Sequence, residues 1–352
     1  MADIIKTQPG LEESLTDSTV EKNNSRNSSI YELLEADIMN SELPLKEKNK
    51  RLSRIIRMRE KRVNILLVGA TGSGKSSTIN ALFNMDVAKV GEGVDPETDE
   101  ITSYILANLT IWDTPGLGDS VDNDERYNLM LTKKLSEIDS DGNMLIDLVL
   151  VVIDSSSKDL GTTIDLINDT IIPCLGESAN GRILVGLNQA DVAMKGKHWN
   201  AEKNEPDEIL LDYLEKKAES VQLRIKDSTN LDIQPVYYCA GYKEAEGDQC
   251  QPYNLAKLLY YIIRSIPAEK RLGIADNINT DKEVWVHNDS YKEYSKEIEK
   301  SFWESVADCI SDKAYDGGSI GEDILGLPGK AIGYVLGGIY GAFAGIFQGV
   351  FS

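Results

Sequence analysis

The sequence has few cysteines and histidines, and it has no excess of positive charge. Its 352 residues include four cysteines with no CxxC pair among them, and two isolated histidines, His198 and His287. This scarcity argues against a zinc site and against a disulfide framework. The formal net charge of -21 argues against broad binding to DNA or RNA, because such binding needs Lys and Arg to neutralise phosphates.

No apolar signal segment opens the chain, because its first ten residues, MADIIKTQPG, turn polar within a few positions. We therefore expect a protein of the reducing cytoplasm, either free or held peripherally or by its C-terminus at a membrane. An apolar content of 41% supports a sizeable core, and the length allows one large domain or two modest ones.

Composition divides the chain into five parts. Residues 1–29 are rich in Asn, Ser, Thr and Glu, and we predict a disordered tail there. Residues 30–60 have helical apolar spacing. The basic run KEKNKRLSRIIRMREKR, residues 46–62, is either a surface for anionic lipid or RNA or an ordinary solvated helix face. Residues 61–267 alternate strands with helices, residues 268–316 are charged and predicted helical, and residues 317–352 are glycine-rich and hydrophobic.

Residues 61–267 are predicted to form a three-layer α/β domain with a mostly parallel sheet. Strands are expected at RVNILLV, LTIWD, IDLVLVVID, RILVGLN and QPVYYC, with SYILA antiparallel to LTIWD. Helices are expected at residues 75–83, 124–138, 161–175, 206–226 and 254–265. The fully apolar run IDLVLVVID is typical of a central strand that helices cover on both faces.

A glycine-rich segment follows the first expected strand and opens a helix. It matches GxxxxGK[ST] and consists of Gly69, Ala70, Thr71, Gly72, Ser73, Gly74, Lys75, Ser76 and Ser77. Its glycines let backbone N–H groups point inward at phosphate oxygens, and the helix adds its positive N-terminal end. Lys75 is expected to neutralise the β- and γ-phosphates, and the Ser76 hydroxyl to bind Mg²⁺.

Two further motifs end later strands. In WDTPGLGD, Asp113 can reach Mg²⁺ through water, and the Gly116 N–H can bond the γ-phosphate. In LNQAD, Asn188 can bond the N7 and O6 edge of a purine, and the Asp191 carboxylate can accept from guanine N1–H. Adenine has no N1–H and would leave that carboxylate unpaired, so we predict a preference for guanine.

Gln189 stands where a guanine pocket usually has Lys, and we expect its aliphatic stem to pack over the base and toward the phosphate loop. This substitution should weaken affinity more than it changes base preference. Cys239 and Ala240, in the next strand end YYCAGY, are assigned by position to the backbone segment that meets guanine O6.

These motifs, in this order and spacing, resemble the TRAFAC class of P-loop GTPases with a Ras-like G domain, over residues 62–267. GATGSGKSSTINALF, GVDPETDEITSY, IWDTPGLGD and NQAD resemble the Era-related YfjP/YeeP type of bacterial prophage GTPases and the immunity-related GTPases. The resemblance implies GTP and GDP as ligands, Mg²⁺ as cofactor, and a catalytic set of Lys75, Gly116 and a switch threonine. That threonine, also a metal ligand, is Thr98 by position, with Thr102 as the alternative.

Two aids to hydrolysis found in better-known relatives are missing. Leu117 follows DxxG where Ras-like enzymes have a water-orienting Gln, and Gly72 replaces the Asn of potassium-stimulated members. Intrinsic hydrolysis should therefore be slow, with the missing group supplied by a partner or a second copy. Arg126 is either a candidate for that role across a dimer or a plain surface residue.

Glycines recur every fourth residue near the end of the chain, from Gly329 to Gly349, and no charge follows Lys330. Such a helix is weak in water, because each interior Gly costs about 1 kcal/mol relative to Ala. Residues 331–351 either insert in a bilayer and self-associate through GxxxG contacts, or dock on the protein. A third alternative combines the two, with the segment docked in one nucleotide state and released in the GTP state.

Three functions fit this sequence. The first is a GTP-hydrolysing switch coupled to membrane association or to self-assembly as a homodimer or larger array. The second is an Era-like ribosome-associated GTPase, supported by the basic run but disfavoured by the acidic charge and by the lack of a KH-type GxxG module. The third is a GTP-gated scaffold with negligible hydrolysis.

Overall fold

The computed structural model describes residues 29–83, 101–117, 121–158, 160–243 and 249–310. Three sequence predictions lie outside the described residues: the disordered tail up to residue 28, the switch threonine Thr98, and the glycine-rich segment 317–352.

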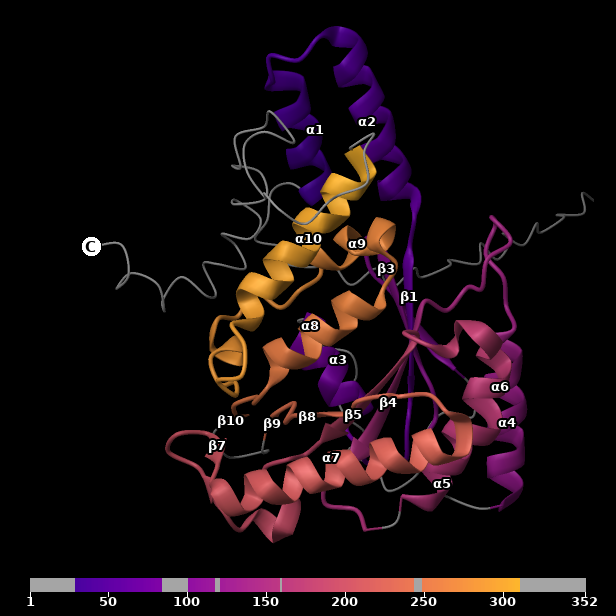
Figure 1. The fold of residues 1–352 in the computed structure, drawn as a ribbon, viewed down its shortest axis with the longest axis vertical. Coiled ribbons are helices and arrows are strands. Elements are labelled where there is room, and N and C mark those ends of the chain that lie inside the picture. Colours follow the sequence, from indigo (N-terminus) through magenta and orange to yellow (C-terminus); the bar gives the residue numbers. More distant parts are fainter. Residues whose placement is uncertain (1–28, 84–100, 118–120, 159, 244–248, 311–352) are drawn as a thin grey trace, which may run out of the picture.

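A six-stranded sheet forms the centre of the molecule (Figure 1). The strand order is β2-β3-β1-β4-β5-β8, and every neighbouring pair is parallel except β2 with β3. The strands are β1 (Val63–Val68), β2 (Thr102–Ile105), β3 (Leu109–Asp113), β4 (Leu148–Asp154), β5 (Ile183–Asn188) and β8 (Val236–Tyr237). The α/β fold with a mostly parallel sheet is therefore confirmed, and β1 and β3 end side by side with Leu67 opposite Asp113.

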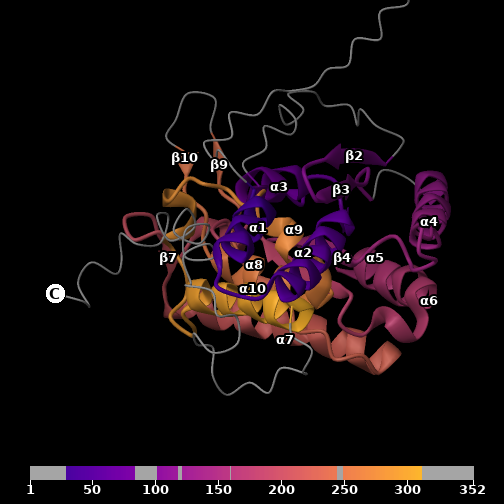
Figure 2. The same cartoon turned by 90° about the horizontal axis from the view of Figure 1, so that it is seen from above.

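Helices cover both faces of the sheet, which gives three layers (Figure 2). Alternate residues of β1 serve two cores: Ile65 and Leu67 belong to one, and Leu66 and Val68 to the other. The first core lies under α3 (Lys75–Phe83), α8 (Leu255–Ser265) and α9 (Leu272–Ala275). The second lies under α4 (Val121–Leu135), α5 (Gly161–Asp165), α6 (Ile172–Leu175) and α7 (Glu208–Thr229). Strands with two buried faces read as continuous apolar runs, as β4 does.

The flanking helices extend the first core and do not form a separate one. Helices α1 (Ile30–Asn40) and α2 (Leu45–Glu60) form a hairpin, and α10 (Tyr294–Ile310) packs against α2 and α8. Their buried side chains, including Tyr31, Ile55 and Phe302, join those of β1 and α8 in one cluster. Helix α1 begins at a capping box, in which the Ser29 hydroxyl accepts from the Glu32 N–H and the Glu32 carboxylate accepts from the Ser29 N–H.

Two expected helices differ from the structure. The expected helix 161–175 contains a π-helical turn, η1 (Leu166–Ile171), between α5 and α6. Residues 268–316 were expected to be helical, yet between α9 and α10 the described chain holds only one short 3-10 turn, η5 (Glu283–Trp285). The Asn279 side chain competes with the helix there, because its amide donates to the carbonyl of Ala81. The backbone carbonyl of Asn279 accepts from the Trp285 indole.

Small elements complete the described fold. They are the 3-10 turns η2 (Gly176–Ala179), η3 (Ala193–Gly196) and η4 (Ala268–Lys270), and the two-residue strand pairs β6 (Trp199–Asn200) with β7 (Glu205–Pro206) and β9 (Tyr242–Lys243) with β10 (Gln249–Cys250). The sequence did not predict these pairs. The strand expected at QPVYYC is also shorter than expected, since β8 covers two residues.

Candidate functional site

The glycine-rich loop connects the end of β1 to the start of α3, and close neighbours explain two of its glycines. Gly69 has φ +155°, and a Cβ there would lie 2.2 Å from the carbonyl oxygen of Val152. Gly74 has φ +87°, and a Cβ there would lie 2.2 Å from the Asn188 amide nitrogen. Neither position accepts a side chain, so the loop stays close against β4 and the end of β5.

Lys75 is the first residue of α3, where the loop ends, and is 9% exposed. Its Nζ donates to the carbonyl oxygens of Gly69, at 3.0 Å, and Ala70, at 3.3 Å. Burial lowers the pKa of Lys75, and the nearby Asp113 carboxylate raises it in opposition. The ammonium group is thus held inside the loop that backbone N–H groups are expected to line, where an anionic phosphate would stabilise its charge.

Asp113, the last residue of β3, faces the first turn of α3. The Ser76 hydroxyl donates to Asp113 Oδ2 at 3.3 Å, while Asp113 Oδ1 is buried and has no hydrogen-bond partner among the described residues. Burial raises the pKa of this carboxyl, and the charge of Lys75 and the bonds from Ser76 and Thr114 lower it in opposition. A buried carboxylate oxygen without a partner beside a serine hydroxyl fits the oxygen ligands that Mg²⁺ requires.

The segment after Asp113 packs directly on the phosphate loop. Thr71 N–H donates to the carbonyl of Leu117 at 3.2 Å, and Leu117 N–H donates to the carbonyl of Gly69 at 3.3 Å. A Cβ on Gly116 would lie 1.9 Å from Thr71 Oγ1 and 2.5 Å from Thr71 Cα. Only glycine therefore permits this close approach to the phosphate loop.

Asn188, at the end of β5, connects the base side of the site with the phosphate side. Its amide donates to the carbonyl of Ser73 at 2.9 Å, and its side-chain oxygen accepts from the Ala240 N–H at 3.0 Å. Gln189, in the left-handed conformation with φ 59°, donates from Nε2 to the carbonyl of Gly72 at 2.7 Å. Gln189 therefore reaches the phosphate loop, as a lysine stem would be expected to do.

The remaining sequence candidates are distributed around this centre. Asp191 is half-buried in the turn that follows β5, and Cys239 is buried after β8, with its sulfur accepting from the Gly241 N–H at 3.3 Å. Thr102 opens β2 opposite Asp113 in the sheet register, and Arg126 is exposed on α4. Ser77 follows Ser76 on α3, and Thr98 lies outside the described residues.

Two buried hydroxyl groups that the motifs did not reveal lie beneath the site. Thr78 Oγ1 donates to the carbonyl of Gly74 at 2.8 Å and lies 2.7 Å from the Tyr238 hydroxyl, and both residues are fully buried. Because the Thr78 proton is committed to Gly74, Tyr238 donates to Thr78. The Tyr238 carbonyl also accepts from the Ala190 N–H at 3.1 Å, so this residue joins the phosphate loop to the LNQAD turn.

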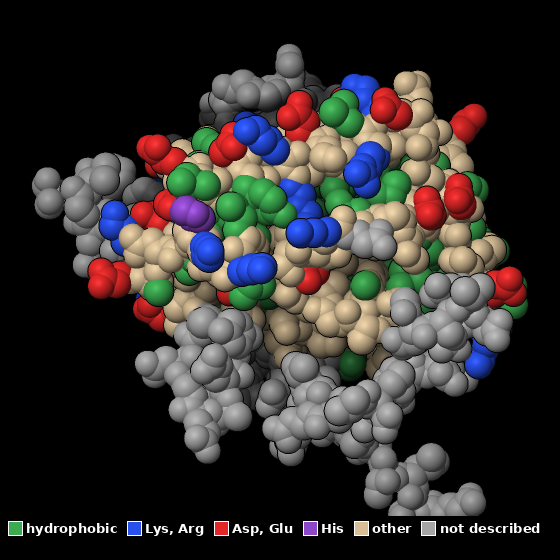
Figure 3. Space-filling model, turned by 90° about the horizontal axis from the view of Figure 1, so that it is seen from below, with side chains coloured by type: hydrophobic (Ala, Val, Ile, Leu, Met, Phe, Trp, Pro, Cys, Tyr) green, Lys and Arg blue, Asp and Glu red, His purple; other side chains and the backbone are tan. Residues whose placement is uncertain are grey.

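The face at which the parallel strands end is richer in positive charge than the composition suggests. Figure 3 views this face, and several Lys and Arg side chains gather near its middle. The loops that follow β4 and β5 carry the exposed residues Lys158, Lys195 and Lys197. In a chain with a net charge of -21, this local excess favours an anionic ligand at this edge.

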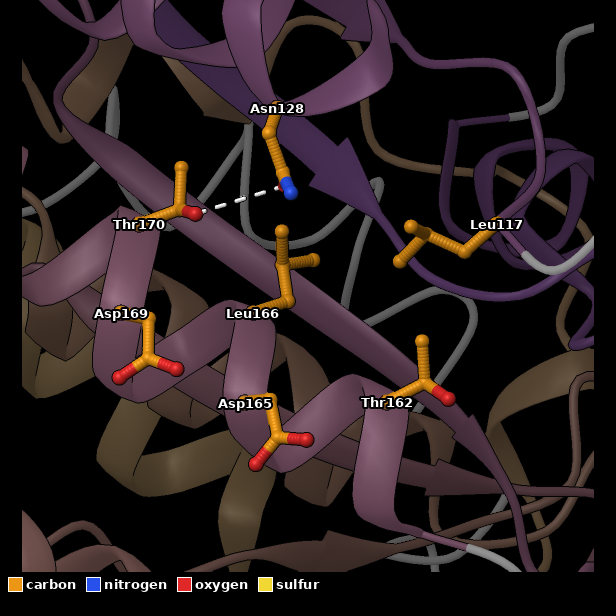
Figure 4. A pocket seen from close by; sticks show the side chains of 7 residues that line it. All are labelled: Leu117, Asn128, Thr162, Asp165, Leu166, Asp169 and Thr170. Carbon is orange, nitrogen blue, oxygen red and sulfur yellow. Dashed lines mark hydrogen bonds between the residues drawn. The ribbon is translucent and has the colours of Figure 1, made fainter. Parts of the chain in front are cut away.

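A small pocket borders the segment after Gly116. Figure 4 shows its lining residues, with Leu117 and Asn128 on one side and, from α5 and η1, Thr162, Asp165, Leu166, Asp169 and Thr170 on the other. The Thr170 hydroxyl donates to Asn128 Oδ1 at 3.4 Å. Leu117, which bonds the phosphate loop, lines this pocket, whereas Asp113 and Asn188 do not.

The fold and this arrangement of loop, carboxylate and base-edge asparagine are those of a P-loop GTPase domain. Residues 64–189 match the family described as 50S ribosome-binding GTPase. The match covers the phosphate loop, DxxG and the start of LNQAD.

Individual relatives resemble parts of the chain. An uncharacterized protein, YfjP, of Escherichia coli is 28% identical over 156 residues, which are 44% of this chain and 50% of that protein. The septin homolog spn1 of Schizosaccharomyces pombe is 35% identical over 85 residues, 20% of this chain and 18% of that protein. The chain thus spans half or less of the length of these relatives. Among solved structures, Toc33 of Arabidopsis thaliana with Mg²⁺ and GMPPNP has a TM-score of 0.38 and 15% identity, covering 68% of this chain and 92% of that one.

Proposed function

We propose that this protein binds GTP and GDP and acts as a molecular switch that hydrolyses GTP. The observation that carries the proposal is the pair of hydrogen bonds made by the Asn188 side chain. One holds the phosphate loop through the Ser73 carbonyl, and the other holds the base-side segment through the Ala240 N–H. Asp191, two residues past Gln189, supplies the carboxylate that would accept from guanine N1–H. Gln189 occupies its position without disturbing these contacts, since its amide bonds Gly72.

Mg²⁺ would be held by Ser76 and Asp113, with the switch threonine, Thr98 or Thr102, as a further ligand. When bound, the ion neutralises charge on the β- and γ-phosphates. Burial on balance raises the pKa of Asp113, and the Lys75 charge and the bonds from Ser76 and Thr114 oppose that rise, as the positive charge of the bound ion would. Lys75 adds positive charge on the phosphate side, and Gly116 offers its N–H to the γ-phosphate.

Hydrolysis by one copy alone is expected to be slow. Leu117 directly follows Gly116 and is 5% exposed, so an apolar, buried side chain occupies the position of a water-orienting glutamine. The missing group is proposed to come from a partner or from a second copy, for which the exposed Arg126 on α4 is a candidate.

The switch is proposed to act at a membrane or through self-assembly, from the cytoplasmic side. Support comes from the sequence of residues 331–351, which has no charge and repeats small residues at the spacing of close helix contacts. Among the described helices, none combines the length and the hydropathy that crossing a bilayer requires. The alternative of a ribosome-associated GTPase draws on the family's description and on the basic helix α2, whereas DNA is not an expected partner.

Single-turnover GTP hydrolysis over a range of protein concentrations tests the proposal. A rate constant that rises with protein concentration indicates a switch activated by self-assembly. A slow, concentration-independent rate favours activation by another partner, and binding without measurable hydrolysis leaves the GTP-gated scaffold. Lys75→Ala serves as the control, and retention of micromolar GTP binding by that variant would contradict the assignment of the phosphate loop.

A further inference from the structure

Helices α1 and α2 form a hairpin that rises beyond the amino ends of the strands, at the opposite end of the sheet from the nucleotide site (Figure 1). Ile55 and Met58 fix α2 in the core, at 0% and 2% exposure. The opposite side of α2 is exposed along its whole length. This face therefore has no role in the site described above.

Helix α2 concentrates positive charge in an acidic protein. Its 16 residues include seven Lys or Arg and two Glu, in a chain with a net charge of -21. Some of these cations serve the fold: Arg59 lies 3.8 Å from Glu32 and 3.9 Å from Glu35, and Arg54 donates to the Ile310 carbonyl at 2.6 Å. These contacts tie α2 to α1 and to the end of α10.

Three other cations lie on one exposed line. Lys46, Lys50 and Arg57 are spaced by four and seven residues, so at 100° per residue they fall within about 40° of one another around the helix. Beside this line runs an apolar one, with Leu45 exposed by 70% and Ile56 by 48%. A line of cations next to exposed aliphatic side chains is the pattern of a helix that lies on an anionic bilayer surface.

The end of α10 lies against the same helix. The Arg54 guanidinium bonds the Ile310 carbonyl, and the Cys309 thiol lies 3.7 Å from the Arg54 carbonyl oxygen. The chain then continues from this point toward residues 331–352, which carry no charge. The sequence of that segment would add a second signal to the basic line of α2, as stable membrane attachment requires.

We propose that the exposed face of α2 binds the headgroups of an anionic lipid bilayer through Lys46, Lys50 and Arg57, with Leu45 and Ile56 entering the interface. The proposal rests on the membrane coupling of the proposed function and names the surface and lipid class for it. Each cation near an anionic surface is worth about 1 kcal/mol, or about a fivefold change in binding. Loss of all three should weaken binding on the order of a hundredfold.

The test is co-sedimentation of the full chain with vesicles of phosphatidylcholine alone and of phosphatidylcholine with 30% phosphatidylglycerol (about one anionic lipid in three). Lys46→Gln, Lys50→Gln and Arg57→Gln are combined in one variant. The matched control combines Lys133→Gln, Lys216→Gln and Lys226→Gln, which remove the same charge from exposed positions of α4 and α7. GTP binding and hydrolysis are measured on both variants, because α2 is remote from the nucleotide site.

We expect the wild-type chain and the control to bind the anionic vesicles, and the α2 variant to lose that binding while its GTP hydrolysis stays unchanged. Equal binding of the α2 variant and the control, or equal binding to neutral vesicles, would overturn the assignment of this surface. Retention of an RNA homopolymer by the wild-type chain but not by the α2 variant, without vesicle binding, would overturn it in favour of nucleic acid. Failure of GTP hydrolysis in the wild-type chain would instead contradict the proposed function.

Discussion

The contact between Gly116 and Thr71 leads to a specific expectation for Gly116→Ala. The added methyl group would lie 1.9 Å from Thr71 Oγ1, 2.5 Å from Thr71 Cα and 2.6 Å from Thr71 N. The side-chain oxygen can rotate away, but the two backbone atoms belong to the phosphate loop and cannot. The substitution therefore forces the segment around Gly116 away from the loop.

The magnitude follows from the bonds that this separation breaks. The Thr71–Leu117 and Leu117–Gly69 backbone hydrogen bonds are lost, at about 0.5–1.5 kcal/mol each. A Gly116 N–H that no longer reaches the γ-phosphate removes a charge-assisted bond of about 1.5–3 kcal/mol, or roughly 10- to 150-fold in affinity. GDP has no γ-phosphate, so its affinity should change little.

Titration with fluorescent GDP and with a fluorescent non-hydrolysable GTP analogue measures both affinities. We expect the ratio of GTP-analogue to GDP affinity to fall about tenfold or more, and hydrolysis to slow. Adding Thr71→Gly to Gly116→Ala should restore little, because Thr71 Cα and N remain. Full restoration by Thr71→Gly, or an equal loss of GDP and GTP affinity, would refute the reasoning.

Two further expectations concern buried polar groups of the site. Tyr238→Phe should lower the free energy of unfolding by about 1 kcal/mol. The double variant with Thr78→Val should lose less stability than the sum of the two single variants, because the two hydroxyls bond each other. Additive losses in urea unfolding would contradict this coupling. Burial raises the pKa of Asp113 above its ordinary 3.8, so the ligand-free fold holds a proton at Asp113 more tightly than the unfolded chain does, and stability falls as pH rises through that window. Asp113→Asn should therefore stabilise the magnesium-free protein at pH 7.5 and lose this advantage near pH 4; a less stable variant at pH 7.5 would show that the ionised carboxylate supports the fold.

Local signals in the sequence were enough to predict the sheet and to propose the site, because each motif stands directly at the end of an apolar strand. The parallel register then brings the end of β3 beside the end of β1, and Asp113 beside the phosphate loop. Gln189 was expected to extend toward that loop, and its amide bonds Gly72.

Other features depend on packing between distant segments, which one sequence does not display. Thr78 and Tyr238 lie 160 positions apart, and nothing local distinguishes this tyrosine from Tyr237 beside it. The irregular chain between α9 and α10 is fixed by contacts such as that of Asn279 with Ala81. The π-helical turn in η1 is likewise absent from the apolar spacing, which fits an α-helix equally well.

The identity of the base tests the central claim most directly. Displacement of fluorescent GDP by GTP, ATP and xanthosine triphosphate would be measured on the wild-type chain and on Asp191→Asn, with Mg²⁺ present. We expect GTP to displace at least ~100-fold better than ATP from the wild-type protein, and Asp191→Asn to shift the preference to the xanthine nucleotide. Equal displacement by ATP and GTP, or unchanged GTP selectivity in Asp191→Asn, would contradict a guanine site built on Asn188, Gln189 and Asp191.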